Sequence, residues 1–239
     1  MREALARPGT VREVFATSDS IRRQPALLEA ARAARVPVSQ VGEDAAAALS
    51  ETVTPQGLVA VCAQIDVSLT DALAGTPRLV AVLVDIRDPG NAGTVLRTAD
   101  AAGAAAVIFA GDTVDPYNGK CVRASAGSLF HLEVVRAGDA AAVTETLRAA
   151  GLRVLAATGG GDTDLDDLPD EELAAPTAWL FGSEAHGLPP AIAAAADAQV
   201  RVPIHGRAES LNLGAAAAVC LYTSARAQRG HGAPKEPRT

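Results

Sequence analysis

The sequence predicts an α/β protein in which a mostly parallel sheet, covered by helices on both faces, follows a smaller α/β domain. Apolar runs typical of strands alternate with helical stretches from Leu79 onward, which is the pattern of a parallel sheet. A shorter series of the same kind fills residues 1–63. The 239 residues, of which 49% are hydrophobic, suffice to bury the cores of two domains without disulfides or metals.

The first domain is expected over residues 1–63. Alternating or uniformly apolar runs predict its strands, and stretches of helical composition predict its helices. The strands are Val11–Ala16, Val36–Val38 and Leu58–Cys62, and the helices are Gln24–Ala34 and Glu43–Ser50. The polar stretch 64–78, which closes on Thr76-Pro77, is expected to be a linker.

The second domain is expected over residues 79–228. Its strands are Leu79–Asp85, Ala105–Phe109, Leu132–Val135, Arg153–Ala157, Ala178–Gly182 and Gln199–Pro203. Helices fit between them at Asn91–Ala102, Gly119–Ala126, Asp139–Ala150 and Pro190–Ala196, and a last, alanine-rich helix fits at Asn212–Ala227. The remainder, 229–239, is rich in Gly, Pro and charge and is expected to be a disordered tail.

Composition excludes several classes of protein. No apolar run is long enough to cross a membrane, and Met1-Arg2-Glu3-Ala4 does not begin a secretory signal, so we expect a cytoplasmic protein. Cys62, Cys121 and Cys220 lie far apart and form no ligand cluster with histidines. We therefore expect buried thiols and no metal site.

The net charge of −7 disfavours an extended surface for a polyanion such as RNA. The charge is unevenly distributed, however. Residues 1–50 hold seven arginines against six acidic residues, whereas Asp162 to Glu172 contains seven acids. A nucleic-acid surface must therefore be local, and the acidic stretch is expected to be one solvated loop.

A first segment with chemical potential follows the strand that ends at Asp85. It reads Asp88-Pro89-Gly90-Asn91-Ala92-Gly93-Thr94-Val95-Leu96-Arg97. Pro-Gly favours a turn, Asn91 is the expected N-cap of the next helix, and Arg97 lies in its second turn. A helix that starts at the carboxyl end of a parallel strand often binds a ligand, although a structural helix can have the same residues.

A second segment is Phe181-Gly182-Ser183-Glu184-Ala185-His186-Gly187-Leu188, between a strand and a helix. Gly182 and Gly187 would let the backbone approach a flat ligand, and Glu184 would accept hydrogen bonds at its edge. His186 is a possible base, but a lone histidine in a glycine loop is more often incidental. We give it no part in the chemistry.

A third segment leaves the last strand through a polar loop into Glu209-Ser210-Leu211-Asn212-Leu213 and the alanine-rich helix. Ser210 or Asn212 is placed to cap that helix, and its small residues allow close packing against another backbone. Taken alone, this pattern also fits an ordinary buried helix.

The three segments in order, N-x-G-x-x-x-R, F-G-S-E-x-x-G-L and E-S-L-N-L, closely resemble the three motifs of the SpoU/TrmH branch of the SPOUT methyltransferases. The resemblance covers about residues 79–227. Thr54–Ala60 is similar to the end of the RNA-binding domain that precedes many of these enzymes, a domain that itself resembles certain ribosomal proteins.

The resemblance implies that the second domain contains a trefoil knot, an exception to the rule that chains do not knot. It also implies that S-adenosyl-L-methionine binds in a bent form against the knotted loops. The donor-binding residues that it implies are Thr158, Gly159, Phe181, Gly182, Ser183, Glu184, Gly187, Ile204, Leu211 and Leu213.

The reaction that the resemblance implies is in-line attack of a ribose 2′-oxygen on the donor's methyl group, with Arg97 as the base. Because a guanidinium stays protonated in proteins, we expect Arg97 to be essential as a clamp on phosphate that orients the hydroxyl. Asn91 would position Arg97, Ser210 and Asn212 would hold the ribose or the neighbouring loop, and Glu184 would hold the second loop and the donor.

The implied partners are RNA and a second copy of the chain, because these enzymes usually act as homodimers whose site is completed across the interface. Arg97, Lys120 and Arg123 are the expected RNA contacts. Ribosomal RNA is the preferred substrate because of the first domain, and transfer RNA stays open. The family's first domain commonly begins upstream of the position of Met1, so the native start either lies upstream or the domain is abbreviated.

Two alternatives share this fold: an RNA-binding protein that has lost catalysis, and a knotted methyltransferase that acts on a base. A nicotinamide-dependent dehydrogenase is disfavoured, because Gly159-Gly160-Gly161 follows the fourth strand and runs into an acidic loop instead of a helix.

Overall fold

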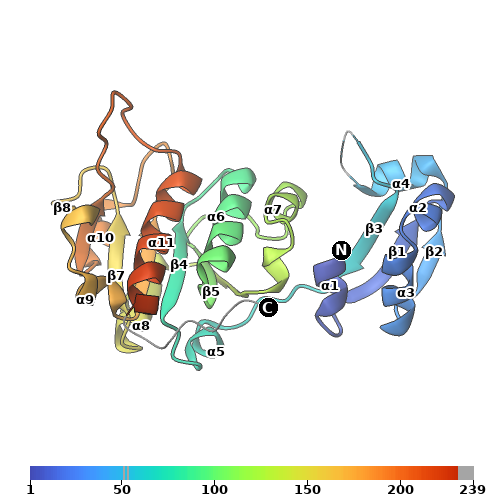
Figure 1. Ribbon diagram of the computed structural model, residues 1–239, viewed down its shortest axis with the longest axis horizontal. Helices are drawn as coiled ribbons and strands as arrows, with labels where there is room; N and C mark the ends of the chain where they lie inside the picture. Colours follow the sequence, from blue (N-terminus) through green and yellow to red (C-terminus); the bar gives the residue numbers. More distant parts are fainter. Residues whose placement is uncertain (51, 53, 231–239) are drawn as a thin grey trace. The chain divides into compact units, whose positions relative to one another are not determined.

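The computed structural model describes residues 1–50, 52 and 54–230, which form two compact units (Figure 1). The first unit ends at Ile65 and the second begins at Asp66. Most of the tail expected over 229–239 lies outside the described residues. Its first two residues, Arg229 and Gly230, continue the last helix.

The first unit has a three-stranded sheet in the order β2-β1-β3, with β1 parallel to β2 and antiparallel to β3. Its elements are α1 (Arg2–Ala6), β1 (Val11–Ala16), α2 (Ser18–Arg23), α3 (Pro25–Ala33), β2 (Val38–Gln40), α4 (Glu43–Ser50) and β3 (Leu58–Cys62).

Two details of the first unit differ from the prediction. Strand β2 starts two residues later than expected, because Pro37 lacks the N–H that a ladder needs. A short helix, α2, precedes the expected one: Thr17 caps it by accepting from the amide of Ser20, and it ends at Arg23, before Pro25 starts α3. Helix α1 was also not predicted.

The second unit has a seven-stranded sheet in the order β6-β5-β4-β9-β7-β10-β8, and its strand pairs are parallel. The strands are β4 (Leu79–Val84), β5 (Ala106–Ala110), β6 (Glu133–Ala137), β7 (Arg153–Ala157), β8 (Thr163–Asp164), β9 (Thr177–Phe181) and β10 (Ala198–Arg201). The helices are α5 (Leu69–Leu73), α6 (Pro89–Ala102), α7 (Gly119–Ala124), α8 (Ala140–Ala149), α9 (Asp170–Ala174), α10 (Pro190–Ala195) and α11 (Leu213–Gly230), with 3-10 turns at Ser128–Phe130 and Leu165–Asp167. The predicted parallel sheet is confirmed.

Strand β4 lies between two hydrophobic cores, and every one of its residues is buried. Leu79, Ala81 and Leu83 face a core that includes side chains of α6, α7, α9 and α11. Val80, Val82 and Val84 face a second core, built with α5, α8 and α10. Because successive side chains of a strand point to opposite faces, β4 contributes to both cores, as expected for a sheet covered on both faces. Figure 1 shows α6 and α11 side by side over one face of the sheet.

Two stretches expected to lack structure contain short elements. Within 64–78, α5 buries Ala72 and Leu73 in the second core, and the amide of Val67 donates to the carbonyl of Val134 in the edge strand β6. The expected linker is therefore packed on the second unit over much of its length. Within the acidic stretch, which contains β8 and α9, Leu173 of α9 lies in the core, whereas Asp164 and Glu172 are half-buried and the other acids are exposed.

The cysteines are free thiols. Cys121 and Cys220 are buried, and burial raises the pKa of each to about 12, so both are inert apolar side chains. Cys62 is only half-buried.

Candidate active site

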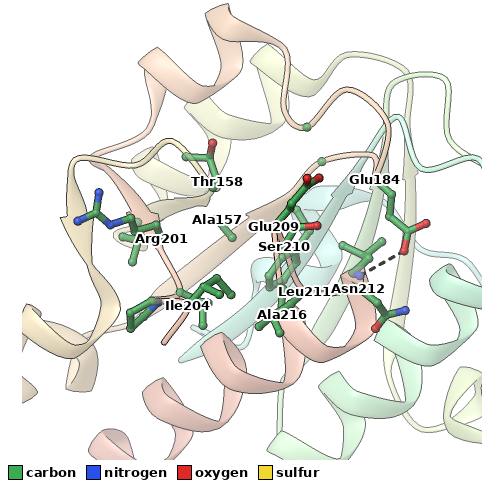
Figure 2. A pocket seen from close by; sticks show the side chains of 18 of the residues that line it. Ala157, Thr158, Glu184, Arg201, Ile204, Glu209, Ser210, Leu211, Asn212 and Ala216 are labelled. Atoms are coloured by element: carbon green, nitrogen blue, oxygen red, sulfur yellow. Dashed lines mark hydrogen bonds between the residues drawn. The ribbon is translucent and has the colours of Figure 1, made fainter. Parts of the chain in front are cut away.

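The carboxyl ends of β9, β7 and β10, three neighbours in the sheet, surround a cavity of about 810 Å³ (Figure 2). The loop after β9, the loop after β10 and the first turn of α11 close it. All ten residues expected to bind a donor line this cavity: Thr158, Gly159, Phe181, Gly182, Ser183, Glu184, Gly187, Ile204, Leu211 and Leu213. Ser210 and Asn212 line it as well.

The loop after β9 closes on itself. The amides of Ser183 and Gly187 each donate to the carbonyl of the other, at 3.1 and 2.7 Å. Gly182 lies so close to this turn that an added Cβ would be 2.1 Å from the carbonyl carbon of Gly187 and 2.2 Å from the amide nitrogen of Leu188. The loop's own backbone therefore requires glycine at position 182, whereas we had expected a flat ligand to be the reason.

Glu184 connects this loop to the third segment. Its Oε1 accepts from the amide of Leu213 at 3.3 Å, the bond drawn in Figure 2. That amide belongs to the first turn of α11, where unpaired N–H groups and the helix dipole favour a carboxylate. The side chain is otherwise exposed. Glu184 thus fixes the relative position of two walls of the cavity.

The third segment caps α11 through Asn212, whose Oδ1 accepts from the amide of Ala215 at 2.9 Å. Of the two caps considered from the sequence, Asn212 is the one used, and Ser210 is exposed at the cavity. Gly214 brings α11 close to α6, since an added Cβ would lie 2.6 Å from Cγ2 of Thr94. The small residues of α11 therefore allow the close packing that the sequence predicted.

The lining of the cavity combines apolar side chains with oxygen acceptors. Ala157, Ile204, Leu211 and Ala216 give it apolar surface, and Thr158 and backbone groups of the loops provide polar atoms. A concave site of this size and mixture suits a small-molecule ligand.

An ion pair lies at one rim, where both oxygens of Asp164 accept from the guanidinium of Arg201. This contact lowers the pKa of Asp164 and raises that of Arg201. Glu209 also lines the cavity. We did not select Glu209 from the sequence, although its place directly before Ser210 in the third segment was a signal.

The first segment lines a second cavity of about 780 Å³. The two cavities adjoin, because Ser183, Glu184, Gly187 and Leu213 line both. Asn91 lies in the second cavity and so does His186.

Asn91 is not the N-cap of α6, contrary to the prediction. Asp88 is the cap: its Oδ1 accepts from the amide of Asn91 at 2.8 Å, and Pro89 occupies the first helical position. Asp88 Oδ2 also binds Lys120 Nζ at 2.7 Å. Lys120, expected to contact RNA, is therefore paired with Asp88, and this ion pair joins α6 to α7.

Arg97 lies two turns along α6, and its exposed side chain lines neither cavity. Within residues 1–50, 52 and 54–230, its guanidinium makes no hydrogen bond or ion pair. Arg123 on α7 is also exposed. The structure therefore brings together the second and third segments and Asn91, and it leaves Arg97 outside the cavities of its own chain.

Asp85, at the end of β4, was not selected from the sequence. Its φ of +55° is unusual for a residue other than glycine, and its Oδ1 accepts from the amide of Asp112 at 2.8 Å. It lines the second cavity. Backbone strain of this kind leaves no periodic signal in a sequence.

In the part of the chain that the structure describes, no three His, Cys, Asp or Glu side chains group as they would to hold a metal ion. None of the helices described is long and apolar enough to span a bilayer.

Comparison with known families gives two matches. Residues 78–222 match the SpoU rRNA methylase family, and residues 1–67 match a domain described as RNA 2′-O ribose methyltransferase substrate binding. The two matches correspond closely to the two units of the structure.

Individual relatives and solved structures point to the same family. The chain is 36% identical over 222 residues to the 23S rRNA (guanosine(2553)-2′-O)-methyltransferase RlmP of Bacillus subtilis, which covers 93% of this chain and 84% of that protein. A solved structure of the SpoU methyltransferase AviRb from Streptomyces viridochromogenes, in complex with AdoMet, has a TM-score of 0.81 at 32% identity and covers 97% of this chain and 88% of the other. An AdoMet-bound rRNA methyltransferase from Sinorhizobium meliloti has a TM-score of 0.80 at 30% identity, with 95% and 85% covered.

Proposed function

The chain belongs to the SpoU rRNA methylase family, and on this premise we propose that it transfers a methyl group from S-adenosyl-L-methionine to a ribose 2′-hydroxyl of ribosomal RNA. The observation that carries the proposal is the convergence of the second and third motifs on one cavity, lined by every residue expected to bind the donor. Relatives named as 23S rRNA 2′-O-methyltransferases favour ribosomal RNA as the substrate.

The larger cavity is the proposed donor site. When bound there, S-adenosyl-L-methionine supplies a methyl group on a sulfonium sulfur, which a ribose oxygen attacks in line. Apolar contacts from Ile204, Leu211 and Ala216 would hold the flat part of the molecule, and the loop amides would fix its polar tail. Internal hydrogen bonds constrain the loop Ser183–Gly187 and the start of α11 at Asn212–Ala215, so these segments can align the reacting atoms.

The adjoining cavity is the proposed acceptor site, with Asn91 in its wall and Ser210 and Asn212 at the edge of the donor site. These side chains can hold a ribose by hydrogen bonds. Arg97 would bind the substrate phosphate in a bidentate manner and orient the hydroxyl, while phosphate or solvent accepts the proton.

We further propose that the active protein is a homodimer, in which a second copy of the chain brings Arg97 to the site. Arg97 lines neither cavity of its own chain. The neighbouring helix, α11, exposes Val219 and Tyr222, with 40% and 48% of their surface accessible, on a side that lines a cavity with α9. Because α6 and α11 pack together, this exposed apolar surface and Arg97 can share one interface. Sedimentation equilibrium should give twice the mass of one chain, and a monomer at assay concentration would exclude this arrangement.

Residues 1–63 are the proposed RNA-binding domain and 79–228 the proposed catalytic domain. The arginines of the first domain, with Arg123 of the second, would supply the local positive charge that phosphate binding needs. The sheet order supports the proposed trefoil knot, since β9 returns to the middle of the sheet before the chain leaves again for β10. A protein that modifies ribosomal RNA would work in the cytoplasm.

The experiment is transfer of a labelled methyl group from the donor to total RNA from a strain that lacks the protein, followed by nuclease digestion and mass spectrometry. We expect label in ribosomal RNA, on a ribose 2′-oxygen. Label on a base would indicate the base-directed alternative. Donor binding without transfer to any RNA would indicate a member of the family that has lost catalysis.

A further inference from the structure

The donor cavity has an unbalanced charge. Four ionisable side chains line it: Asp164, Glu184, Arg201 and Glu209. The cation among them, Arg201, is already paired with Asp164 through two hydrogen bonds. Two carboxylates therefore face the cavity without a cation from the described lining residues to balance them.

The two carboxylates differ in their surroundings. Glu184 accepts from the amide of Leu213 in the first turn of α11, so its charge is partly offset by the helix dipole. Glu209 is exposed, and within the described part of the chain its side chain makes no hydrogen bond or ion pair. In Figure 2 the Glu209 carboxylate lies in the opening between Thr158 and Glu184. Its full negative charge is therefore available to a ligand.

The methyl donor and the product of methyl transfer differ in charge. S-adenosyl-L-methionine has a positive sulfonium as well as an amino acid zwitterion, so it is a cation. S-adenosylhomocysteine has a neutral thioether in its place and no net charge. The cavity must bind the first and release the second in every cycle, and shape distinguishes them only by one methyl group, which is a weak basis for selection.

We propose that Glu209 is a specificity-determining residue that favours the cationic donor over the neutral product by electrostatic attraction to the sulfonium. This inference rests on the proposed function of the cavity. It predicts that loss of the Glu209 charge weakens donor binding, leaves product binding in place, and makes the enzyme more sensitive to inhibition by its product.

The expected size of the effect follows from exposure. A carboxylate a few ångströms from a cation in a partly hydrated site contributes an attraction worth about fivefold in affinity, and screening by salt reduces it. An effect of this size can be measured reliably and is far smaller than the loss of a required contact.

The test is isothermal titration calorimetry of the full-length protein and its Glu209→Gln variant with three ligands: the donor, the product, and sinefungin, which has a protonated amine where the donor has its sulfonium. Glutamine keeps the size and hydrogen-bonding capacity of the side chain. Glu171→Gln on α9 is the matched control, because this substitution changes the net charge by the same amount. Glu171 is exposed and lines neither cavity.

We expect Glu209→Gln to weaken the donor and sinefungin by about fivefold and to leave the product within about 1.5-fold. An equal loss for all three ligands would mean that Glu209 shapes the cavity, and no loss for any of them would mean that its charge does not reach the sulfonium; either result overturns the proposal. If the wild-type protein binds neither donor nor product, the proposed function itself fails.

A salt titration of the wild-type protein gives a second measurement that does not depend on a variant. Raising sodium chloride should weaken donor binding more than product binding, because only the donor is attracted through a screened charge. Parallel changes in the two affinities would contradict the electrostatic mechanism.

Discussion

The two halves of the candidate site are built differently. The donor half is enclosed by loops that bind each other, through Ser183 with Gly187 and through Glu184 with Leu213. The acceptor half consists of the adjoining cavity, and its expected essential residue, Arg97, does not line that cavity but is exposed on α6. On our proposal, one chain is sufficient to bind the methyl donor, whereas transfer needs RNA and a second chain to complete the site.

The largest effect that separates the two halves is expected from Arg97→Ala. Because we propose that the guanidinium contacts only the acceptor, the change should lower kcat by about 10³-fold or more and leave donor affinity within a few-fold. Methyl-transfer rates and calorimetry with the donor measure the two quantities. Arg123→Ala, an exposed arginine on the adjacent helix α7, is the control and should cost less than about tenfold, mainly in KM for RNA. Near-normal turnover by the Arg97→Ala variant would contradict the proposed role of Arg97.

A large effect on the donor half is expected from Gly182→Ala. The new Cβ would meet backbone atoms of Gly187 and Leu188 at 2.1 and 2.2 Å, and neither can move without opening the loop. We expect donor affinity to fall more than about tenfold, since overpacking of this kind costs about 1–3 kcal/mol. Gly160→Ala, with no atom within 4 Å of its added Cβ, is the control for donor titrations. Unchanged donor binding by Gly182→Ala would show that the loop does not shape the cavity.

Sequence reasoning located the donor half because its signals are local. The F-G-S-E and E-S-L-N-L segments each follow a strand, and parallel strands place such segments at one edge of the sheet. It could not give the reason for Gly182, since that reason is contact with a residue five positions later. It also missed Glu209, because the position before Ser210 was visible in the sequence but the place of its side chain in the cavity lining is apparent only when the cavity is formed.

A moderate effect is expected at Asp85, which supports the acceptor half. Asp85→Ala removes the acceptor for the Asp112 amide and places alanine at φ of +55°. We expect unfolding in urea to show a loss of about 1–2 kcal/mol. Asp85→Asn should retain most of the stability, because asparagine tolerates this backbone conformation and its side-chain oxygen can accept the same bond. Equal losses in both variants would show that the carboxylate charge, instead of the local geometry, is what matters.

The smallest expected effect is a change in the pKa of Asp88. The ammonium of Lys120 and the amide of Asn91 lower the pKa of Asp88. A lowered pKa in the folded state contributes stability above the unfolded pKa, and that contribution is lost as the pH falls through the folded value, below about 4. Lys120→Ala should raise the pKa of Asp88, measured by NMR of its carboxyl carbon. Arg123→Ala should leave it in place, and an unmoved Asp88 in Lys120→Ala would mean that the ion pair is absent in solution.

The acceptor half was harder to predict, for physical reasons. Asn91 and Asp88 are both good cap residues three positions apart, and only the position of Pro89 at the first turn decides between them. The pairing of Lys120 with Asp88 could not be predicted, because Asp88 lies 32 positions away in the sequence, and Lys120 was therefore expected to contact phosphate.

The helices α5 and α9 were missed because each has five residues, too few for a helical period to emerge.

The most direct test of the division between the halves is a complementation experiment with two inactive variants. Leu211→Arg, at a residue of the donor cavity with 37% of its surface exposed, should fold and repel the cationic donor. Co-purified with Arg97→Ala, it should form mixed dimers in which one intact donor cavity meets one intact Arg97. We predict that methyl transfer reappears in the mixed dimers. No recovered activity in verified mixed dimers would place Arg97 at the site of its own chain and contradict the account.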